Sequence, residues 1–385
     1  MPSTGLRSSS KAGLFSPCFS PSLPGRQGAC LHPSSAHSMN SSHPTTMRAA
    51  VMHKPGDIRL EDKPKPQVRA GHALVKVAVC GVCGSDIPRM LQKGAHVMPL
   101  ICGHEFAGYV EALGEGVQGH AIGDLVTVPP LLPCGTCDQC ARGFPSRCTD
   151  YDYFGSRRDG AYAEYVNVPA ANLLTCPEGM DPAAAAMTDP AAVALHAIWK
   201  ARFTLGHVGA VVGCGPIGLF AIQWMKLLGG KDIIGVDIDP RKLALAREAG
   251  ATHTRLGSEP MDDLPGCHLI IEAAGHPTAI NQAIRMAAPG GSVVCIGIPA
   301  GDIVLESVTF SHLLRQEVTL AGAWNSFGTP FPGEEWVVSL AKLASGELKW
   351  KFMVTHDLPL EDLGAMFENF AQKKQSAAKV LFRPA

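Results

Sequence analysis

Four cysteines that lie close together constrain this chain more than any other feature of its sequence. The first three are three positions apart, and the fourth follows eight positions later: Cys134, Cys137, Cys140 and Cys148. Four thiolates at such spacing can complete a tetrahedral zinc shell with no open position, as structural zinc sites do. Pro133 and Gly135 suit the tight turn that this loop requires. The alternative is four free, buried cysteines, and we predict the zinc site.

The cysteine count bears on the compartment. The chain has 13 cysteines, an odd number, in 385 residues. Disulfide frameworks are typical of short secreted chains. We therefore interpret these cysteines as metal-bound thiolates and expect a reducing compartment, the cytoplasm.

Length and overall composition predict an ordinary globular protein of two domains. Charged residues make up 17% of the chain and the net charge is −1, which favours neither nucleic acid nor an acidic interaction tail. The longest apolar stretches, 183–187 and 191–199, are too short to span a bilayer. We therefore expect no nucleic-acid partner and no membrane association.

Residues 1–46 differ from the rest. They contain 12 serines and no acidic residue, and Met39 and Met47 could both start translation. We interpret the segment as a disordered extension or an over-extended gene start. The alternative is a transit peptide, which would direct the protein to an organelle.

Two patterns follow Met47. Up to about residue 176, short β-like runs alternate with Gly and Pro, and we predict strands at 73–79, 106–112, 124–128 and 163–168. From about residue 191, strands alternate with helices, which predicts a parallel, doubly wound α/β sheet. Its predicted elements are strands at 209–212, 233–236, 269–272 and 292–296, and helices at 217–228 and 240–249. The tail from Gly333 predicts two amphipathic helices and a last strand at 379–382.

A glycine-rich turn joins the first of these strands to the first helix. The turn reads Gly213-Cys-Gly215-Pro216-Ile217-Gly218. Its glycines permit a tight turn, close approach of a pyrophosphate and close helix–strand packing, and the helix start supplies N–H groups to the anion. Asp237 follows Gly218 by 19 residues and could accept hydrogen bonds from ribose hydroxyls.

The carboxylate of Asp237 would repel a 2′-phosphate, so NAD is favoured over NADP. The alternative for Asp237 is a simple turn residue. Lys242 could reach the same ribose, or could be a solvated residue on a helix face.

A second group of candidate ligands lies upstream of the four cysteines. Cys83 precedes Ser85 and Asp86, and His104 precedes Glu105. Thiolate, imidazole and carboxylate are zinc ligands, and two or three of them leave a position for a substrate oxygen. Asp86 suits a hydrogen bond to the second nitrogen of His104. The alternatives are a core histidine and a turn aspartate.

Together these features resemble the zinc-containing medium-chain alcohol dehydrogenases. The resemblance runs from Met47 to the end of the chain, through the segments CGSDIPRMLQKGAH, GHEFAGYV, VPPLLPCGTCDQCARGF, YDYFGSRRDGAYAEY, LRQEVTLAGAWNSFGTPFPGEEW and AAKVLF. It implies a GroES-like, β-rich catalytic domain at 47–190 and 327–385, and a Rossmann NAD-binding domain at 191–326. It also implies a small-molecule substrate, two Zn²⁺ and one NAD per chain, in a homodimer or homotetramer.

The resemblance further implies residue roles. A catalytic zinc would be held by Cys83, His104 and the residue before Pro190, which is Asp189 here where the family has Glu. Related polyol enzymes use the equivalent of Glu105, so the third ligand stays open between Asp189 and Glu105. Ser85 would accept the alcohol proton, and Lys379 would contact the cofactor pyrophosphate.

Within the family, the chain looks most like members that oxidise phosphorylated sugar alcohols such as galactitol 1-phosphate. Arg89, Arg157 and Arg158 are the candidate phosphate contacts, because the planar guanidinium can donate two parallel hydrogen bonds. The alternatives are a dehydrogenase of sorbitol, L-iditol or L-threonine and, more distantly, a non-catalytic NAD-binding sensor.

Overall fold

The computed structural model describes residues 45–299, 301–372 and 377–384. The prediction of an extension or transit segment at 1–46 therefore lies almost wholly outside the described residues. In the described ranges, no helix is long and apolar enough to cross a membrane.

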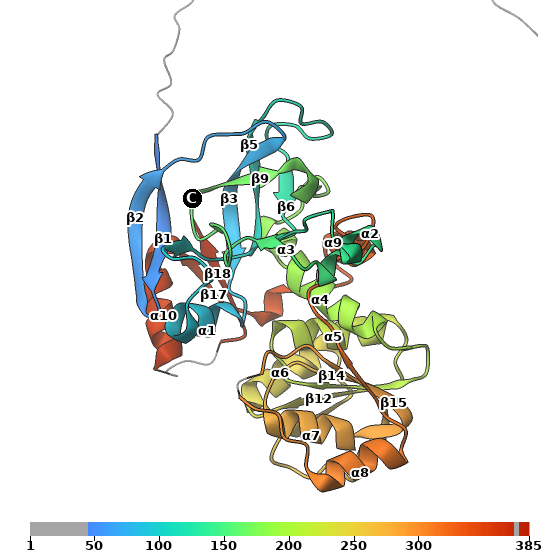
Figure 1. Cartoon of the computed structure of the whole chain (residues 1–385). Helices are drawn as coiled ribbons and strands as arrows, with labels where there is room; N and C mark the ends of the chain where they lie inside the picture. Colours follow the sequence, from blue (N-terminus) through green and yellow to red (C-terminus); the bar gives the residue numbers. More distant parts are fainter. Residues whose placement is uncertain (1–44, 300, 373–376, 385) are drawn as a thin grey trace, which may run out of the picture. The chain divides into compact units, whose positions relative to one another are not determined.

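The N-terminal part is built on β-sheets, as predicted. A mixed seven-stranded sheet has the order β10-β6-β5-β3-β18-β17, with β9 also paired to β3 (Figure 1). Its strands are β3 (His72–Gly81), β5 (Glu105–Leu113), β6 (Leu125–Thr127), β9 (Tyr165–Pro169), β10 (Leu174–Thr175), β17 (Val354–Pro359) and β18 (Lys379–Arg383). The end of the chain therefore returns to complete the sheet, since β18 pairs antiparallel with β3.

A second sheet packs beside it in the same hydrophobic core. Strand β1 (Thr46–Lys54) pairs antiparallel with β2 (Asp57–Pro64) and with the short β4 (Leu100–Ile101). The sequence patterns did not predict the β1–β2 hairpin or β17.

Short elements between these strands carry most of the candidate ligands. Helix α1 (Asp86–Pro88) runs into the π-helical turn η1 (Arg89–Lys93), directly after β3. Of the four cysteines, Cys140 lies in α2 (Asp138–Ala141), two precede that helix, and Cys148 follows the 3₁₀ turn η2 (Pro145–Arg147). The small β7–β8 pair (Leu131–Leu132 and Asp152–Tyr153) flanks them.

A six-stranded, wholly parallel sheet forms the second half, with the order β13-β12-β11-β14-β15-β16. The strands are β11 (Val208–Val212), β12 (Asp232–Asp237), β13 (His253–Leu256), β14 (Cys267–Glu272), β15 (Ala287–Cys295) and β16 (Thr319–Gly322). This is the doubly wound order, which reverses between β11 and β14, where such sheets bind dinucleotides.

Helices cover both faces of the parallel sheet. Apolar residues of α5 (Pro216–Leu227) and α6 (Pro240–Ala249) pack on one face, and those of α7 (Pro277–Arg285) pack on the other (Figure 1). α8 (Ser307–Arg315) lies next to α7. The predicted α/β fold is thus present, although the domain boundaries at residues 190 and 326 stay predictions.

The remaining helices lie between the two sheet systems in sequence or near the C-terminus. They are α3 (Pro182–Ala186), α4 (Thr188–Trp199), α9 (Glu334–Ala344) and α10 (Leu363–Ala371), with 3₁₀ turns η3 (Ala170–Asn172), η4 (Lys351–Met353) and η5 (Leu360–Asp362). α4 packs against both α5 and α9. Asp189 lies in its first turn, where it is buried.

Candidate active site

The four cysteines converge as their spacing predicts. Their sulfur atoms all lie within 4.8 Å of one another. Cys148 Sγ is 3.4 Å from Cys134 Sγ and 3.9 Å from Cys137 Sγ, and all four are free of disulfides. In a tetrahedral site with zinc–sulfur bonds of about 2.3 Å, the sulfur atoms lie about 3.8 Å apart. The four cysteines therefore fit a zinc ion with little movement of the loop.

The backbone around these cysteines is arranged to stabilise thiolates. The backbone N–H of Cys137 points at Cys134 Sγ (3.4 Å), and the N–H of Cys134 points at Cys148 Sγ (3.3 Å). Hydrogen bonds from the N–H groups of Cys140 and Thr149 lower the pKa of Cys137 to about 6. Burial and the neighbouring thiols raise the pKa of Cys140 to about 12, so four thiolates together require a positive charge among them, which a zinc ion would supply.

The second ligand group is assembled by strand pairing. Gly81, at the end of β3, is opposite Glu105, at the start of β5. Cys83 follows one strand and His104 precedes the other, so their side chains meet at the same end of the sheet. Ligand atoms of Cys83, His104 and Glu105 all lie within 4.8 Å of one another. Asp189 is not part of this group.

Asp86 contacts several of the residues around that group. It is fully buried, and its carboxylate accepts hydrogen bonds from Arg89 Nη1 (2.6 Å), the Tyr162 hydroxyl (3.0 Å) and the backbone N–H of Cys83 (3.2 Å). Asp86 Oδ1 also lies 3.5 Å from His104 Nδ1. A carboxylate beside one imidazole nitrogen leaves the other nitrogen for a metal ion.

The protonation behaviour of Cys83 and His104 also suits a cation between them. Burial raises the pKa of the Cys83 thiol, but the adjacent His104 outweighs burial and brings it down to about 7. Burial lowers the pKa of His104, whereas Asp86 and Cys83 raise it to about 10. The pair therefore favours a thiolate that faces a positive charge, which a divalent metal ion would supply in place of the proton.

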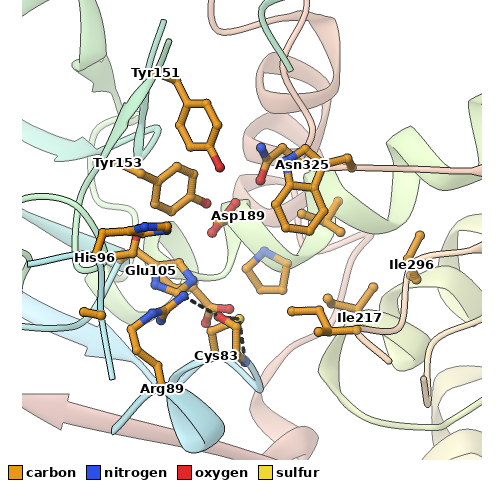
Figure 2. A pocket seen from close by; sticks show the side chains of 18 of the residues that line it. Cys83, Arg89, His96, Glu105, Tyr151, Tyr153, Asp189, Ile217, Ile296 and Asn325 are labelled. Atoms are coloured by element: carbon orange, nitrogen blue, oxygen red, sulfur yellow. Dashed lines mark hydrogen bonds between the residues drawn. The ribbon is translucent and has the colours of Figure 1, made fainter. Parts of the chain in front are cut away.

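A cavity of about 420 Å³ opens beside the second ligand group (Figure 2). This volume is within the range of small-molecule sites. Its wall includes Ser85, whose Oγ lies 3.3 Å from Cys83 Sγ, and Asp189. Burial raises the pKa of Asp189 to about 7. On the side of the parallel sheet, Ile217 and Ile296 close the wall.

A further cavity lies at the glycine-rich turn. It is lined by Gly213, Gly215, Asp237 and Lys242. Gly213 has φ +100°, and a Cβ on Gly218 would lie 2.0 Å from the Gly213 carbonyl oxygen, so neither position tolerates a side chain. A Cβ on Gly215 would meet no atom within 4 Å. The three glycines thus have the positions expected for turn, ligand approach and packing.

Asp237 ends β12 at that cavity. Its carboxylate accepts hydrogen bonds from the backbone N–H groups of Cys214 (2.8 Å) and Asp239 (2.9 Å). These bonds fix the carboxylate at the cavity wall while lone pairs remain for a ribose.

Comparison with known proteins shows the family of this chain. Two family models match: an alcohol dehydrogenase GroES-like domain at residues 69–178, and a zinc-binding dehydrogenase domain at residues 216–342. Galactitol 1-phosphate 5-dehydrogenase of Escherichia coli strain K12 is 36% identical over 342 residues, covering 86% of this chain and 97% of that protein. The chain belongs to the zinc-dependent medium-chain alcohol dehydrogenases.

A crystal structure and a second relative agree. Galactitol-1-phosphate dehydrogenase from Escherichia coli matches the structure with a TM-score of 0.83 and 36% identity, covering 88% of this chain and all of that one. Sorbitol dehydrogenase of Bacillus subtilis strain 168 is 31% identical over 360 residues, covering 90% of this chain and 99% of that protein. The chain is thus an alcohol or polyol dehydrogenase of a family that uses zinc and NAD.

Two of the three arginines predicted to bind phosphate lie outside the dehydrogenase's zinc-site cavity. The guanidinium of Arg157 stacks on the Tyr151 ring (4.4 Å), in a neighbouring depression. Arg158 pairs with Asp152 (3.2 Å). The Nε of Arg157 has no hydrogen-bond partner, and no substrate is present, so the role of both arginines as phosphate contacts stays a prediction. Arg89 does line the cavity.

The prediction for Lys379 is not supported. Lys379 is 1% exposed, and its ammonium group is hydrogen-bonded to Glu105 and to the Val82 carbonyl (3.1 Å). It lines neither cavity. A buried ammonium that compensates the charge of Glu105 has no exposed surface to offer to a pyrophosphate.

Several cavity residues of the dehydrogenase were missed in the sequence. His96, Tyr151, Tyr153, Trp324 and Asn325 all line the cavity. None of them belongs to a motif with a known ligand spacing, and residues 324 and 325 are far from the others in sequence. The only available signal was their place inside segments that resemble the family.

Proposed function

We propose that this dehydrogenase oxidises a secondary hydroxyl of a sugar-alcohol phosphate, similar to galactitol 1-phosphate, with NAD as hydride acceptor. The observation that carries the proposal is the position of Arg89, Lys93 and His96. All three basic side chains line the cavity that contains the Cys83 and His104 ligands. Arg89 is paired with the buried Asp86, which leaves Lys93 as the cation that can meet a substrate at this wall. An uncharged polyol does not require such a cation, whereas a phosphate dianion does.

We assign residue roles on the same grounds. Cys83, His104 and Glu105 would hold the catalytic zinc ion, and Asp189 would face the substrate from the cavity wall. Bound zinc supplies a Lewis acid that makes a substrate hydroxyl easier to deprotonate. Ser85, beside Cys83 in the cavity wall, would accept that proton while its own hydroxyl proton passes on to water or to a ribose hydroxyl of the cofactor. Asp86 orients His104 from the buried side.

At the other cavity, the nucleotide would lie on the N-terminus of α5, with its pyrophosphate near Gly215. The Asp237 carboxylate would accept hydrogen bonds from the ribose hydroxyls and repel a 2′-phosphate. NAD is therefore the preferred nucleotide, and Lys242 at the same cavity is the second candidate ribose contact.

The test is a screen of NADH formation over polyols and their monophosphates, with and without a chelator. We expect kcat/KM for a hexitol phosphate to exceed that for the matching hexitol by at least roughly tenfold, as one charge-assisted phosphate contact would give. Equal values would leave a sorbitol-type polyol dehydrogenase as the better description. Turnover that survives removal of all zinc would contradict the proposal.

A matched pair of variants tests the phosphate contact itself. Lys93→Ala removes a cation from the cavity and should raise KM for the phosphate by roughly 10- to 100-fold. Arg158→Ala removes a cation that does not line the cavity, together with a partly exposed pair with Asp152 and a contact with the Phe154 ring, so KM should change by less than about twofold. Equal effects of the two variants would remove the role of Lys93.

We also propose that the enzyme is a homodimer or homotetramer. Within the described residues, no strand pairs with the outer edge of β16. Apolar side chains of Val308, Phe310, Leu314 and Leu320 are exposed on β16 and the nearby α8. Such an edge favours pairing with a second copy. A monomeric mass in light scattering would rule this out.

A further inference from the structure

Asn325 combines two unusual features at the wall of the zinc-site cavity. It is one of two described non-glycine residues with positive φ, at 56°. Its amide Nδ2 is buried and has no hydrogen-bond partner. A left-handed backbone and an unsatisfied buried donor both cost free energy, and such costs concentrate at functional sites.

The chain on the C-terminal side of Asn325 is held firmly. The Trp336 indole N–H donates to Ser326 Oγ (3.1 Å). The Phe327 backbone N–H donates to Ser146 Oγ (2.8 Å), and that hydroxyl donates to the Phe327 carbonyl (2.9 Å). The Phe327 ring also stacks on Trp336 (5.7 Å between centroids). These contacts fix the backbone that sets the direction of Asn325.

Ser146 belongs to the four-cysteine loop, two residues before Cys148. It is buried, and both of its hydrogen bonds go to a residue 181 positions away in the sequence. The loop that suits a structural zinc ion is therefore bonded directly to the segment that carries Asn325 into the substrate cavity.

We propose that the amide of Asn325 donates a hydrogen bond to a hydroxyl of the substrate's carbon chain, and that Ser146 positions it. This inference rests on the proposed function in one respect, namely that the substrate is a polyol. Nδ2 has almost no accessible surface in the empty cavity, so a half-turn of the amide about χ2, which is a soft torsion, would bring this donor to a substrate hydroxyl. The left-handed backbone would be kept because it holds the side chain at the cavity wall.

The place of Asn325 in the cavity favours a hydroxyl over the phosphate. Figure 2 shows Arg89 and His96 on one side of the cavity and Asn325 on the other, with Asp189 between them in the view. A substrate whose phosphate met the basic side would extend its carbon chain toward Asn325. The amide is neutral, so it suits a hydroxyl oxygen.

The test is Asn325→Gly, because glycine accepts the left-handed backbone and removes only the side chain. We expect KM for the best polyol substrate to rise roughly tenfold, with kcat within about threefold of the parent, as for one lost substrate hydrogen bond. The rise should be the same for a phosphorylated and an unphosphorylated polyol. Asn325→Asp, which replaces the donor NH₂ with an oxygen, should raise KM at least as much.

Two further variants separate substrate binding from folding. Glu317→Gly removes the side chain at the other left-handed residue, φ 50°, which does not line the cavity, and should leave KM unchanged. Ser146→Ala should raise KM less than Asn325→Gly, with kcat nearly kept. Thermal unfolding of each variant shows whether the fold is intact.

An unchanged KM in folded Asn325→Gly would overturn the proposal. A rise confined to phosphorylated substrates would also overturn it, because Asn325 would then bind the phosphate. If the enzyme turns over only unphosphorylated polyols, the phosphate part of the proposed function fails, while the Asn325 test still runs on those polyols. Should turnover be absent, calorimetric binding of galactitol and of galactitol 1-phosphate provides the same comparison.

Discussion

The two metal-ligand groups of this enzyme are built in opposite ways. The four cysteines come from one loop, and three of them are partly exposed. Cys83, His104 and Glu105 come from two strand ends brought together by sheet pairing, and the last two are buried. The first group has four ligands, of which Cys134 borders an open depression, whereas the second has three and lies in the wall of the larger substrate cavity with Ser85 and Asp189.

This difference indicates a structural role for the four cysteines and a catalytic role for the Cys83 group. Four sulfur ligands complete a tetrahedral shell, so an ion there can only hold the loop together. Three ligands leave a position open, and the cavity beside them admits a substrate. The surrounding contacts follow the same division: backbone N–H groups support the cysteines, while a buried carboxylate, Asp86, supports His104.

The largest effect is expected when the three-ligand group of Cys83, His104 and Glu105, the open site, loses its thiolate. In Cys83→Ala, zinc content should fall from two to one per chain, and kcat/KM should fall by at least about a thousandfold, because several kcal/mol of Lewis-acid stabilisation are lost. Steady-state kinetics and elemental analysis measure both. Cys176→Ala, at a buried cysteine outside both groups, is the control and should keep two zinc ions. A Cys83→Ala enzyme with near-normal turnover would make the distinction between the two sites untenable.

A smaller effect is expected from the residue behind the ligands. Asp86→Asn keeps the shape but removes the charge that faces His104 and Arg89, and supporting residues of this kind change metal affinity or activity by roughly 10- to 100-fold. Zinc affinity, measured by competition with a chelator, should fall at the open site alone.

Asp138→Asn is the matched substitution beside the four cysteines. Asp138 is exposed and pairs loosely with Arg142 (3.6 Å), so zinc affinity should stay the same there. If Asp138→Asn weakened zinc binding as much as Asp86→Asn, surrounding charge would matter equally at both sites.

The same contrast explains what the sequence could predict. The four cysteines and the glycine-rich turn were found because their residues act within one short segment. Cys83 and His104 were paired from ligand chemistry and from the resemblance, and only the β3–β5 register explains why they meet. Whether Glu105 or Asp189 is the third zinc ligand depends on the positions of their side chains. The spacing of residues in the sequence does not give those positions.

The charge of a residue does not show which partner its side chain contacts. Arg158 and Lys379 are cations in segments that resemble the family. The direction of each side chain decides which group it contacts: Arg158 pairs with Asp152, and Lys379 pairs with Glu105. Asn325 was missed for the same reason, because its backbone angle and its unsatisfied amide exist only in the folded chain.

The smallest effect on catalysis is expected from a change in the four-cysteine group, the closed site. Cys137→Ser should release its zinc ion, lower the thermal midpoint by several degrees and leave the Cys83 group loaded. Because Ser146 would then hold Phe327 less firmly, KM should rise by up to roughly tenfold, which corresponds to the loss of one or two hydrogen bonds, with kcat nearly kept. Combining Cys137→Ser with Asn325→Gly should raise KM no further than Asn325→Gly alone, since both act on one contact. Additive effects would mean that the loop influences the cavity by another route, and a large fall in kcat with unchanged KM would mean that the closed site takes part in the chemistry.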